Sequence, residues 1–266
     1  MCAAGLQRRR AAVGCADRRR AESRLFALCE LDGRMRILPD CDWLVAHPQG
    51  HHGYPQPEND DWEVLVYDDP CKRCGVHGPQ RAGFRLRRSN RAPHSHFRQV
   101  NWVFDVWFVR PDIEALLRGA KFRGLDFREV IDHGSGEPFE GVRQLVVSTS
   151  IDGADTTKLP SVTCKPDNEE GPPLPGPKKY PPAAPYCGAV KHHPPTSLVV
   201  PAASLSRAPD VVYTAAWFGS GGSAFRHTLV SRRFAELVCE NRWRGMDFTA
   251  VSHDGHSERL PTGRCS

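Results

Sequence analysis

The segment "CKRCG" at residues 71–75 carries the most specific chemistry in the sequence. Its two cysteines, Cys71 and Cys74, are three residues apart, a spacing that lets two thiolates bind one metal ion. The glycine that follows frees backbone amides to approach the sulfurs, as in half of a tetrahedral zinc site. A second cysteine–glycine pair, Cys187 and Gly188, follows in "AAPYCGAVKHH". The sequence therefore predicts a zinc knuckle that needs one further ligand.

The fourth ligand is not fixed by spacing, because Ala184 stands where the first cysteine of a second pair would be. Cys164 is the preferred candidate, and His192 and His193 are alternatives. We expect a closed, structural Zn²⁺ site made by Cys71, Cys74, Cys187 and Cys164. The alternative is that the site has decayed and that its cysteines are ordinary small apolar residues.

Catalytic patterns are incomplete in this chain. The "HSE" at 256–258 matches the His-x-Glu of zinc deaminases, but no Pro-Cys-x-x-Cys follows it. The "GSGGS" at 219–223 lacks the lysine of a phosphate-binding loop and the third glycine of a dinucleotide loop, and it predicts a hairpin connection. We therefore expect a protein that is not an enzyme.

The elements that position the cysteines are predicted from an internal repeat. "WFVRPDIEALLRGAKFRGLDFREVIDH" (107–133) aligns with "TLVSRRFAELVCENRWRGMDFTAVSHD" (228–254) at an offset of 121. Each copy predicts a short strand, a helix (about 111–121 and 232–242), an Arg-Gly-x-Asp-Phe turn and a second strand. Gly124 and Gly245 fall at the turn, where a positive φ is often required.

The repeat predicts an α+β (mixed α/β) fold built from two related strand–helix–strand halves with a possible zinc-knuckle loop. The expected divisions are a disordered Arg-rich arm (1–24), a first half with the knuckle and the first repeat (25–160), a Pro-rich linker or loop (161–200) and the second repeat (201–266).

Composition narrows the class of protein. The whole formal charge of +5 resides in residues 1–24, which are either a disordered arm or an over-long start of the reading frame. No apolar run approaches the roughly 18–20 residues that span a bilayer, so no membrane association is expected. The ten cysteines do not read as a disulfide framework in a chain this long, which favours reduced thiols and the cytoplasm.

Charge is segregated around the knuckle. No acidic residue occurs from Cys71 to Phe104, whereas the preceding "PENDDWEVLVYDDP" holds six acids. Such neighbouring strips favour contact with a charged partner, either an acidic protein surface or nucleic acid, with Phe84 and Phe97 interleaved among the basic residues. The candidate partner-binding residues are Asp60, Asp61, Glu63, Arg85, Arg87 and Arg88.

The two cysteine–glycine knuckles, the "LVSRRFAEL" helix and the closing "RGMDF" strand resemble the myxobacterial double-CXXCG motif family. The resemblance covers about residues 60–254, and the chain departs from it at Ala184 and in the Arg-rich start. That family includes immunity proteins paired with swarm-inhibition toxins. The resemblance implies a cytoplasmic immunity protein that binds and neutralises a cognate protein toxin without catalysis. The alternative is a zinc-knuckle protein that binds nucleic acid.

Overall fold

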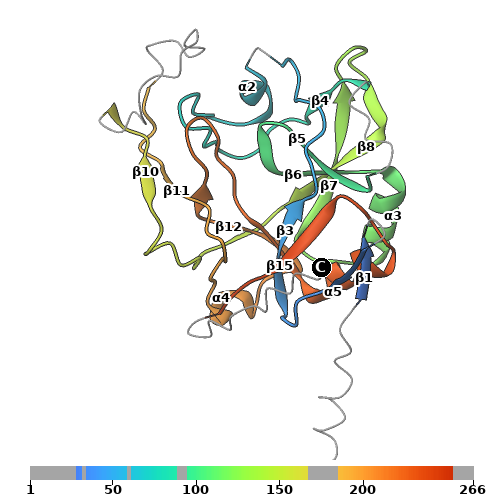
Figure 1. The fold of residues 1–266 in the computed structure, drawn as a ribbon. Helices are drawn as coiled ribbons and strands as arrows, with labels where there is room; N and C mark the ends of the chain where they lie inside the picture. Colours follow the sequence, from blue (N-terminus) through green and yellow to red (C-terminus); the bar gives the residue numbers. More distant parts are fainter. Residues whose placement is uncertain (1–27, 32–33, 59–60, 89–94, 167–184, 254–266) are drawn as a thin grey trace, which may run out of the picture.

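The computed structural model describes residues 28–31, 34–58, 61–88, 95–166 and 185–253. The predicted Arg-rich arm lies outside these ranges. In the described part the fold is rich in strands and its helices are short (Figure 1). This mixed architecture is compatible with the predicted α+β class, although strands dominate more than the repeat alone indicates.

Five strands form the first large sheet, in the spatial order β4-β7-β8-β6-β5. Their bounds are Arg85–Leu86 (β4), Phe97–Val100 (β5), Val103–Val109 (β6), Leu125–Asp132 (β7) and Pro138–Val147 (β8). Both β6 and β7 pair antiparallel with β8, so the two strands of the first repeat run parallel on either side of it.

Five strands also form the second large sheet, in the order β15-β3-β14-β12-β9. Their bounds are Trp43–Pro48 (β3), Ser150–Ile151 (β9), Val211–Thr214 (β12), Thr228–Ser231 (β14) and Met246–Ala250 (β15). Here β14 and β15, the strands of the second repeat, both pair antiparallel with β3 and so run parallel on either side of it. Each repeat therefore places its two strands around a central antiparallel strand.

The second sheet does not follow the predicted boundary at residue 160. Strand β3, which lies between β15 and β14, and the edge strand β9 both come from the predicted first half, residues 25–160. The two parallel strands of a strand–helix–strand unit leave room for one strand between them. In this sheet a strand from a distant part of the chain occupies that position. Local patterning cannot identify that strand, because the pairing joins residues almost 200 positions apart.

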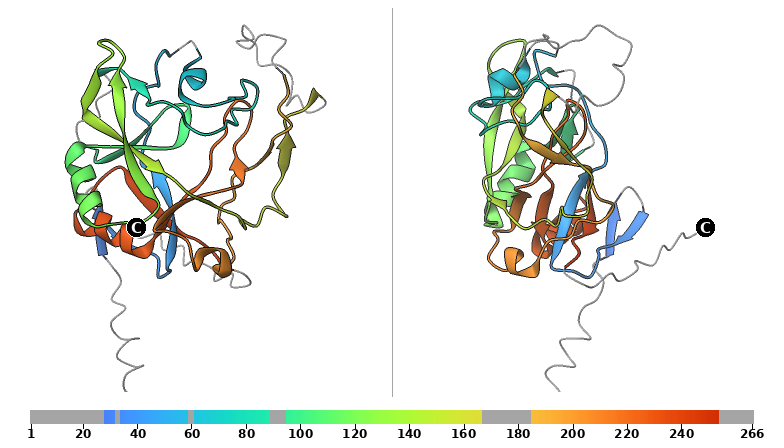
Figure 2. Two further views of the ribbon diagram at one scale, coloured as in Figure 1. Left: turned by 180° about the vertical axis from the view of Figure 1, so that it is seen from behind. Right: turned by 90° about the vertical axis from the view of Figure 1, so that its left-hand side faces the viewer.

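Two smaller sheets complete the described strands. Their members are Leu28–Leu31 (β1) with Arg34–Ile37 (β2), and Ser161–Thr163 (β10), Val190–His192 (β11) and Trp217–Phe218 (β13). The predicted linker 161–200 thus contains two paired strands, β10 and β11, and only its residues 167–184 lie outside the description. These strands lie on the flank of the molecule opposite α3 (Figures 1 and 2).

Four helices are described: Trp62–Val66 (α2), Pro111–Gly119 (α3), Ala202–Leu205 (α4) and Arg232–Glu240 (α5). The two repeat helices, α3 and α5, match the predicted ranges to within two residues. Pro111 occupies the first turn of α3, where its missing N–H costs nothing. Ser231 caps α5, because its side chain accepts from the amide of Phe234.

The repeated Arg-Gly pair connects each repeat to the opposite sheet. The carbonyl of Arg123 accepts from the amide of Val211, the first residue of β12, at 3.2 Å. The carbonyl of Arg244 accepts from Phe97, the first residue of β5, at 3.0 Å. The adjacent Gly124 and Gly245 have φ of 85° and 105°, and a Cβ on either would meet the backbone oxygen of that same partner at 2.2 or 1.8 Å. Glycine is therefore required twice for close packing between the sheets.

Residues separated by the repeat offset of 121 also contact each other. The indole N–H of Trp107 donates to the hydroxyl of Thr228 at 3.1 Å in the buried interior. Two positions upstream in each repeat, the side chains of Asp105 and Arg226 form an ion pair at 3.7 Å. Equivalent positions of the two repeats therefore meet where the sheets adjoin.

A single buried cluster joins the two large sheets. Trp107 and Leu145 from the first sheet pack with Leu44 and Val230 from the second. The apolar faces of α3 and α5 contribute to this cluster, α5 through Phe234 among others. Because both repeats bury their helices in this common core, neither half of the chain is independent of the other.

Candidate metal centre

Four cysteine sulfurs converge where the loop after α2 meets the β10–β11 sheet. The Sγ atoms of Cys71 and Cys164 are 3.8 Å apart, and those of Cys74 and Cys187 are 3.5 Å apart. All four sulfurs lie within 4.8 Å of one another. Tetrahedral coordination with Zn–S bonds of about 2.3 Å places sulfurs about 3.8 Å apart, which the cluster matches closely. The four predicted metal ligands are therefore brought together.

The first knuckle is held by two backbone hydrogen bonds. The amide of Gly75 donates to the carbonyl of Cys71, and the amide of Cys71 donates to the carbonyl of Val76, both at 2.8 Å. Gly75 has a φ of 77°, and a Cβ on it would meet the carbonyl oxygen of Gly222 at 2.3 Å. The glycine of the motif therefore closes the loop and lets it pack on the hairpin before β14.

The second knuckle repeats this pattern with its first cysteine supplied from a distant residue. The amide of Gly188 donates to the carbonyl of Cys164 at 3.1 Å, and the amide of Cys164 donates to the carbonyl of Ala189 at 2.8 Å. Gly188 has a φ of 73°. Cys164 therefore occupies the position that sequence spacing assigned to residue 184.

The residues beside Cys164 and Cys187 also resemble those of the first knuckle. Lys165 follows Cys164, and Tyr186 precedes Cys187, so the sequence with residues 166–185 omitted is "CKYCG", against "CKRCG" at 71–75. The guanidinium of Arg73 stacks over the ring of Tyr186 at 4.1 Å from its centroid. The same position of each knuckle thus contacts the other knuckle.

Burial and backbone donors determine the ionisation of the thiols. Cys71, Cys74 and Cys164 are buried, and Cys187 is exposed. Burial disfavours the thiolate of Cys71, but backbone hydrogen bonds from Cys74 and Arg73 outweigh it and lower its pKa to about 7. Burial raises the pKa of Cys74 and of Cys187. The thiol of Cys71 is therefore deprotonated more easily than those of Cys74 and Cys187. A bound cation would favour the thiolate form of all of them.

A lysine lies directly beneath the first knuckle. The ammonium of Lys191, on β11, donates to the carbonyls of Cys74 (2.9 Å), Gly221 (2.6 Å) and Ser223 (3.0 Å). Lys191 is 3% exposed, so its charge resides inside the protein. A divalent ion with four thiolates has a net charge of −2, and a buried ammonium beside it offsets part of that charge.

The donor set fits a metal centre, because thiolates bind Zn²⁺ and other soft ions and four of them close a tetrahedron. The alternative histidine ligands are not part of the cluster. His192 is directed instead toward Phe218, with ring centroids 6.2 Å apart. Cys239, buried in α5, is disulfide-bonded, so the expectation of fully reduced cysteines is wrong at that position.

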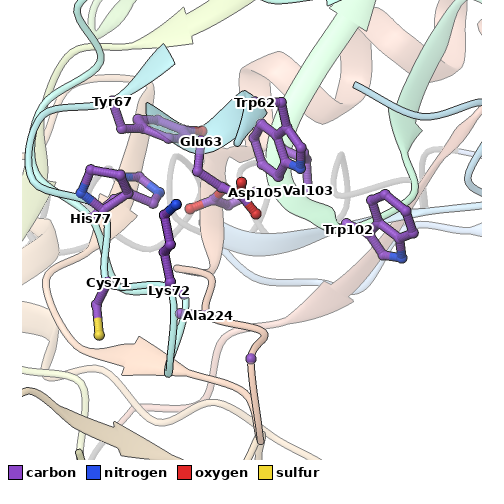
Figure 3. A pocket seen from close by; sticks show the side chains of 13 residues that line it. Trp62, Glu63, Tyr67, Cys71, Lys72, His77, Trp102, Val103, Asp105 and Ala224 are labelled. Atoms are coloured by element: carbon purple, nitrogen blue, oxygen red, sulfur yellow. The ribbon is translucent and has the colours of Figure 1, made fainter. Parts of the chain in front are cut away.

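A pocket adjoins the candidate metal centre. Three residues of the first knuckle, Cys71, Lys72 and Gly75, form part of its wall. Figure 3 shows the side chains of Glu63 and Asp105 directed into it, with the amine of Lys72 approaching from the knuckle. Its remaining walls include Trp62, Tyr67, His77 and Trp102. The imidazole of His77 stacks on Tyr67 at 3.5 Å, and burial lowers its pKa.

The predicted acidic contact residues have different environments. Asp61 is exposed and pairs with Lys72 at 2.5 Å. Glu63 is partly buried in α2, and burial raises its pKa. Asp60 lies outside the described residues. Of these acids, Glu63 lines the pocket, whereas Asp61 is exposed and is not among the lining residues.

The predicted basic contact residues lie at β4. Arg85 and Arg87 are exposed, and Arg88 pairs with the buried Asp132 at 2.6 Å. The wider basic strip is not a single face: Arg98 is 6% exposed, and its burial lowers the guanidinium pKa to about 10. The interleaved Phe84 and Phe97 are fully buried and are not available for base stacking.

No protein-family model matches the chain, and no curated protein is significantly similar to it. Among the described residues no helix has the length and apolarity needed to cross a bilayer.

Sequence reasoning missed Lys191, Asp105 and Trp102. Lys191 occurs in a "VKHH" segment of ordinary polarity, and Asp105 interrupts the apolar run "VFDVWFV". A single charge within such a run is the signal that could have identified Asp105, since a buried carboxylate requires partners. Trp102 carries no periodic signal in the sequence that could have identified it.

Proposed function

We propose that the chain is a zinc-stabilised, non-catalytic binding protein that neutralises a cognate protein toxin in the cytoplasm of the producing cell. The observation that carries this proposal is the pair of facing knuckles formed by Cys71, Cys74, Cys164 and Cys187. It supports the resemblance to the double-CXXCG immunity family at the position where the sequence departs from it, because Cys164 takes the place left by Ala184.

Zinc is the metal proposed for this centre. Four thiolates in a closed tetrahedron without a ligand position for water are typical of structural zinc. The metal joins the loop after α2 to the β10–β11 sheet, two segments about 90 residues apart in sequence. Its role is therefore to fix the relative position of the surfaces that these segments carry.

Duplication of an ancestral unit accounts for the scaffold. The reciprocal Arg-Gly contacts, the pair Trp107–Thr228 and the two knuckles all relate the first repeat to the second in both directions. A twofold relationship brings positions near its axis against their own equivalents, as these contacts do. Such a scaffold presents a broad and rigid surface, which suits inhibition by occlusion.

The surface of α2 and β4 supplies the proposed contacts. Asp61 and Glu63 present acids, and Arg85 and Arg87 present bases that are exposed. Charged rims of this kind accelerate association and select partners of complementary charge. The nucleic-acid alternative receives less support, because Arg98 and the two phenylalanines of the basic strip are buried.

Co-expression tests the proposal directly. Cells that express the product of the gene adjacent to that of this chain should grow only when the chain is present, and the two proteins should co-purify. The combined variant Arg85→Glu and Arg87→Glu should weaken protection, whereas Arg207→Glu, an exposed control beyond α4, should not. Growth inhibition that the intact chain does not relieve would contradict the proposal.

A further inference from the structure

The pocket beside the metal centre combines carboxylates with aromatic rings. Glu63 enters it from α2, and Asp105 enters it from β6 (Figure 3). Trp62, Tyr67 and Trp102 contribute their rings to the same walls. Carboxylates give a cation its counter-charge, and ring faces attract it through their quadrupoles. The wall composition therefore favours a positively charged group.

The carboxylate of Glu63 is the group that requires an explanation. It is partly buried, and its charge is offset by its own backbone amide and by the nearby ammonium of Lys72, but burial outweighs both and raises its pKa. Asp105, which is 3% exposed, differs, since its Oδ2 accepts from the backbone amide of Arg226 at 3.2 Å. A carboxylate that remains partly desolvated in this way is costly, and an incoming cation would offset part of that cost.

Trp102 is held in an unusual conformation at the rim. Its φ is 68°, a left-handed value that a bulky residue rarely adopts, and its side chain is 44% exposed. The ring packs against Tyr54, with centroids 4.6 Å apart. Trp102 is the second residue of the two-residue turn that connects β5 to β6, and the left-handed value belongs to that turn. The turn leaves the indole exposed beside the pocket.

We propose that this pocket binds the primary ammonium of a lysine side chain that a partner protein inserts between Glu63 and the rings of Trp62 and Trp102. The identity of the partner as a toxin rests on the proposed function; the ammonium specificity of the pocket does not.

Lys72 is the internal competitor for this site. Its amine lies at the pocket and is 2.5 Å from the exposed Asp61, so the pocket already has a cation nearby. Removal of that charge should make the carboxylates more available to an external ammonium. The pocket thus predicts opposite effects for two substitutions: weaker binding for Glu63→Gln and tighter binding for Lys72→Met.

A small-molecule titration of the zinc-loaded full chain tests the pocket. The probe is Nα-acetyl-lysine methylamide, followed through the indole N–H resonances of Trp62 and Trp102. We expect saturable shifts, binding weakened about tenfold in Glu63→Gln and strengthened in Lys72→Met, and no change in the exposed control Glu140→Gln. The norleucine analogue, which lacks the ammonium, should not bind.

Each outcome decides between alternatives. Equal binding of the norleucine and lysine probes, or unchanged binding in Glu63→Gln with its metal content intact, would overturn the ammonium site. If the lysine probe binds as expected but the neighbouring-gene product is neither bound nor neutralised, the pocket stands and the toxin proposal fails. If the toxin is neutralised equally well by Glu63→Gln, the toxin proposal stands and its contact lies elsewhere.

Discussion

The amide of Gly188 donates to the carbonyl of Cys164 at 3.1 Å, as the amide of Gly75 donates to that of Cys71 at 2.8 Å. In the first knuckle these two residues are four positions apart, and in the second they are twenty-four apart. The second knuckle is therefore complete in space but interrupted in sequence by residues 166–185. The candidate metal centre consists of two equivalent loops, one continuous and one split.

Substitution of Cys164 tests whether the split knuckle supplies a ligand. Cys164→Ser should lose the bound zinc and destabilise the chain by about 3 kcal/mol or more, because metal binding free energy contributes directly to folding. Metal analysis and urea unfolding measure both effects. Cys41→Ser, which removes a free thiol outside the cluster, should keep one zinc per chain. Equal zinc content in the two variants would remove Cys164 from the site.

Deletion of residues 166–185 tests the equivalence of the two loops. The shortened chain reads "CKYCG", and the first knuckle shows that two residues suffice to connect such a pair of cysteines. We expect the deletion variant to fold and to bind one zinc per chain with unchanged stoichiometry. A folded variant without zinc would show that the long connection is required for the ligand geometry.

The close packing at the repeated Arg-Gly pair predicts that a single added methyl group will strongly lower the free energy of unfolding. Gly245→Ala would place a Cβ 1.8 Å from the carbonyl oxygen of Phe97 at a φ of 105°. We expect a loss of at least about 3 kcal/mol in the free energy of unfolding. Gly119→Ala is the matched control: no atom lies within 4 Å of its Cβ, and it should be neutral or stabilising. A neutral Gly245→Ala would contradict the close contact between the sheets.

Acid should destabilise the fold through His227. Burial lowers the pKa of this imidazole to about 4, below its ordinary value of 6.5, and Phe218 packs against its ring at 4.5 Å. Between these two values the unfolded chain binds more protons, so stability falls as the pH falls through that window, by about 3 kcal/mol in total. Urea unfolding from pH 7 to pH 4 measures the free energy of unfolding of wild type and of His227→Gln. The contribution of the thiolates is the same in both proteins and cancels in the difference between the two profiles. Parallel pH profiles would show that His227 is protonated normally in the folded state.

Local pattern predicted the positions of the two helices α3 and α5. The apolar spacing of Ile113, Leu116 and Leu117 predicted α3, and that of Phe234, Leu237 and Val238 predicted α5. Ile113, Leu117, Phe234 and Val238 are buried as expected, whereas Leu116 is 52% exposed. The position of β3 between β14 and β15 was not predictable, because its sequence specifies a buried strand without specifying its distant neighbours. Sheet order is determined by packing across the whole chain, which single-sequence periodicity does not encode.

The residues of the candidate site were predictable from the sequence, but the backbone pairing that brings them together was not. Thiol chemistry and spacing led to Cys71, Cys74 and Cys187, and Cys164 followed from the need for a fourth ligand. The reason that Cys164 serves, its hydrogen bonds with Gly188 and Ala189, depends on the pairing of β10 with β11 across the Pro-rich insertion. That pairing is a tertiary property, and neither strand is long enough to be recognised alone.

X-ray absorption at the zinc edge of the purified chain tests the central claim most directly. The account predicts one zinc per chain surrounded by four sulfur atoms at about 2.3 Å, a first shell that Cys164→Ser should disrupt. A zinc-free protein that is fully folded, or a first shell that contains nitrogen or oxygen from histidine or water, would contradict it.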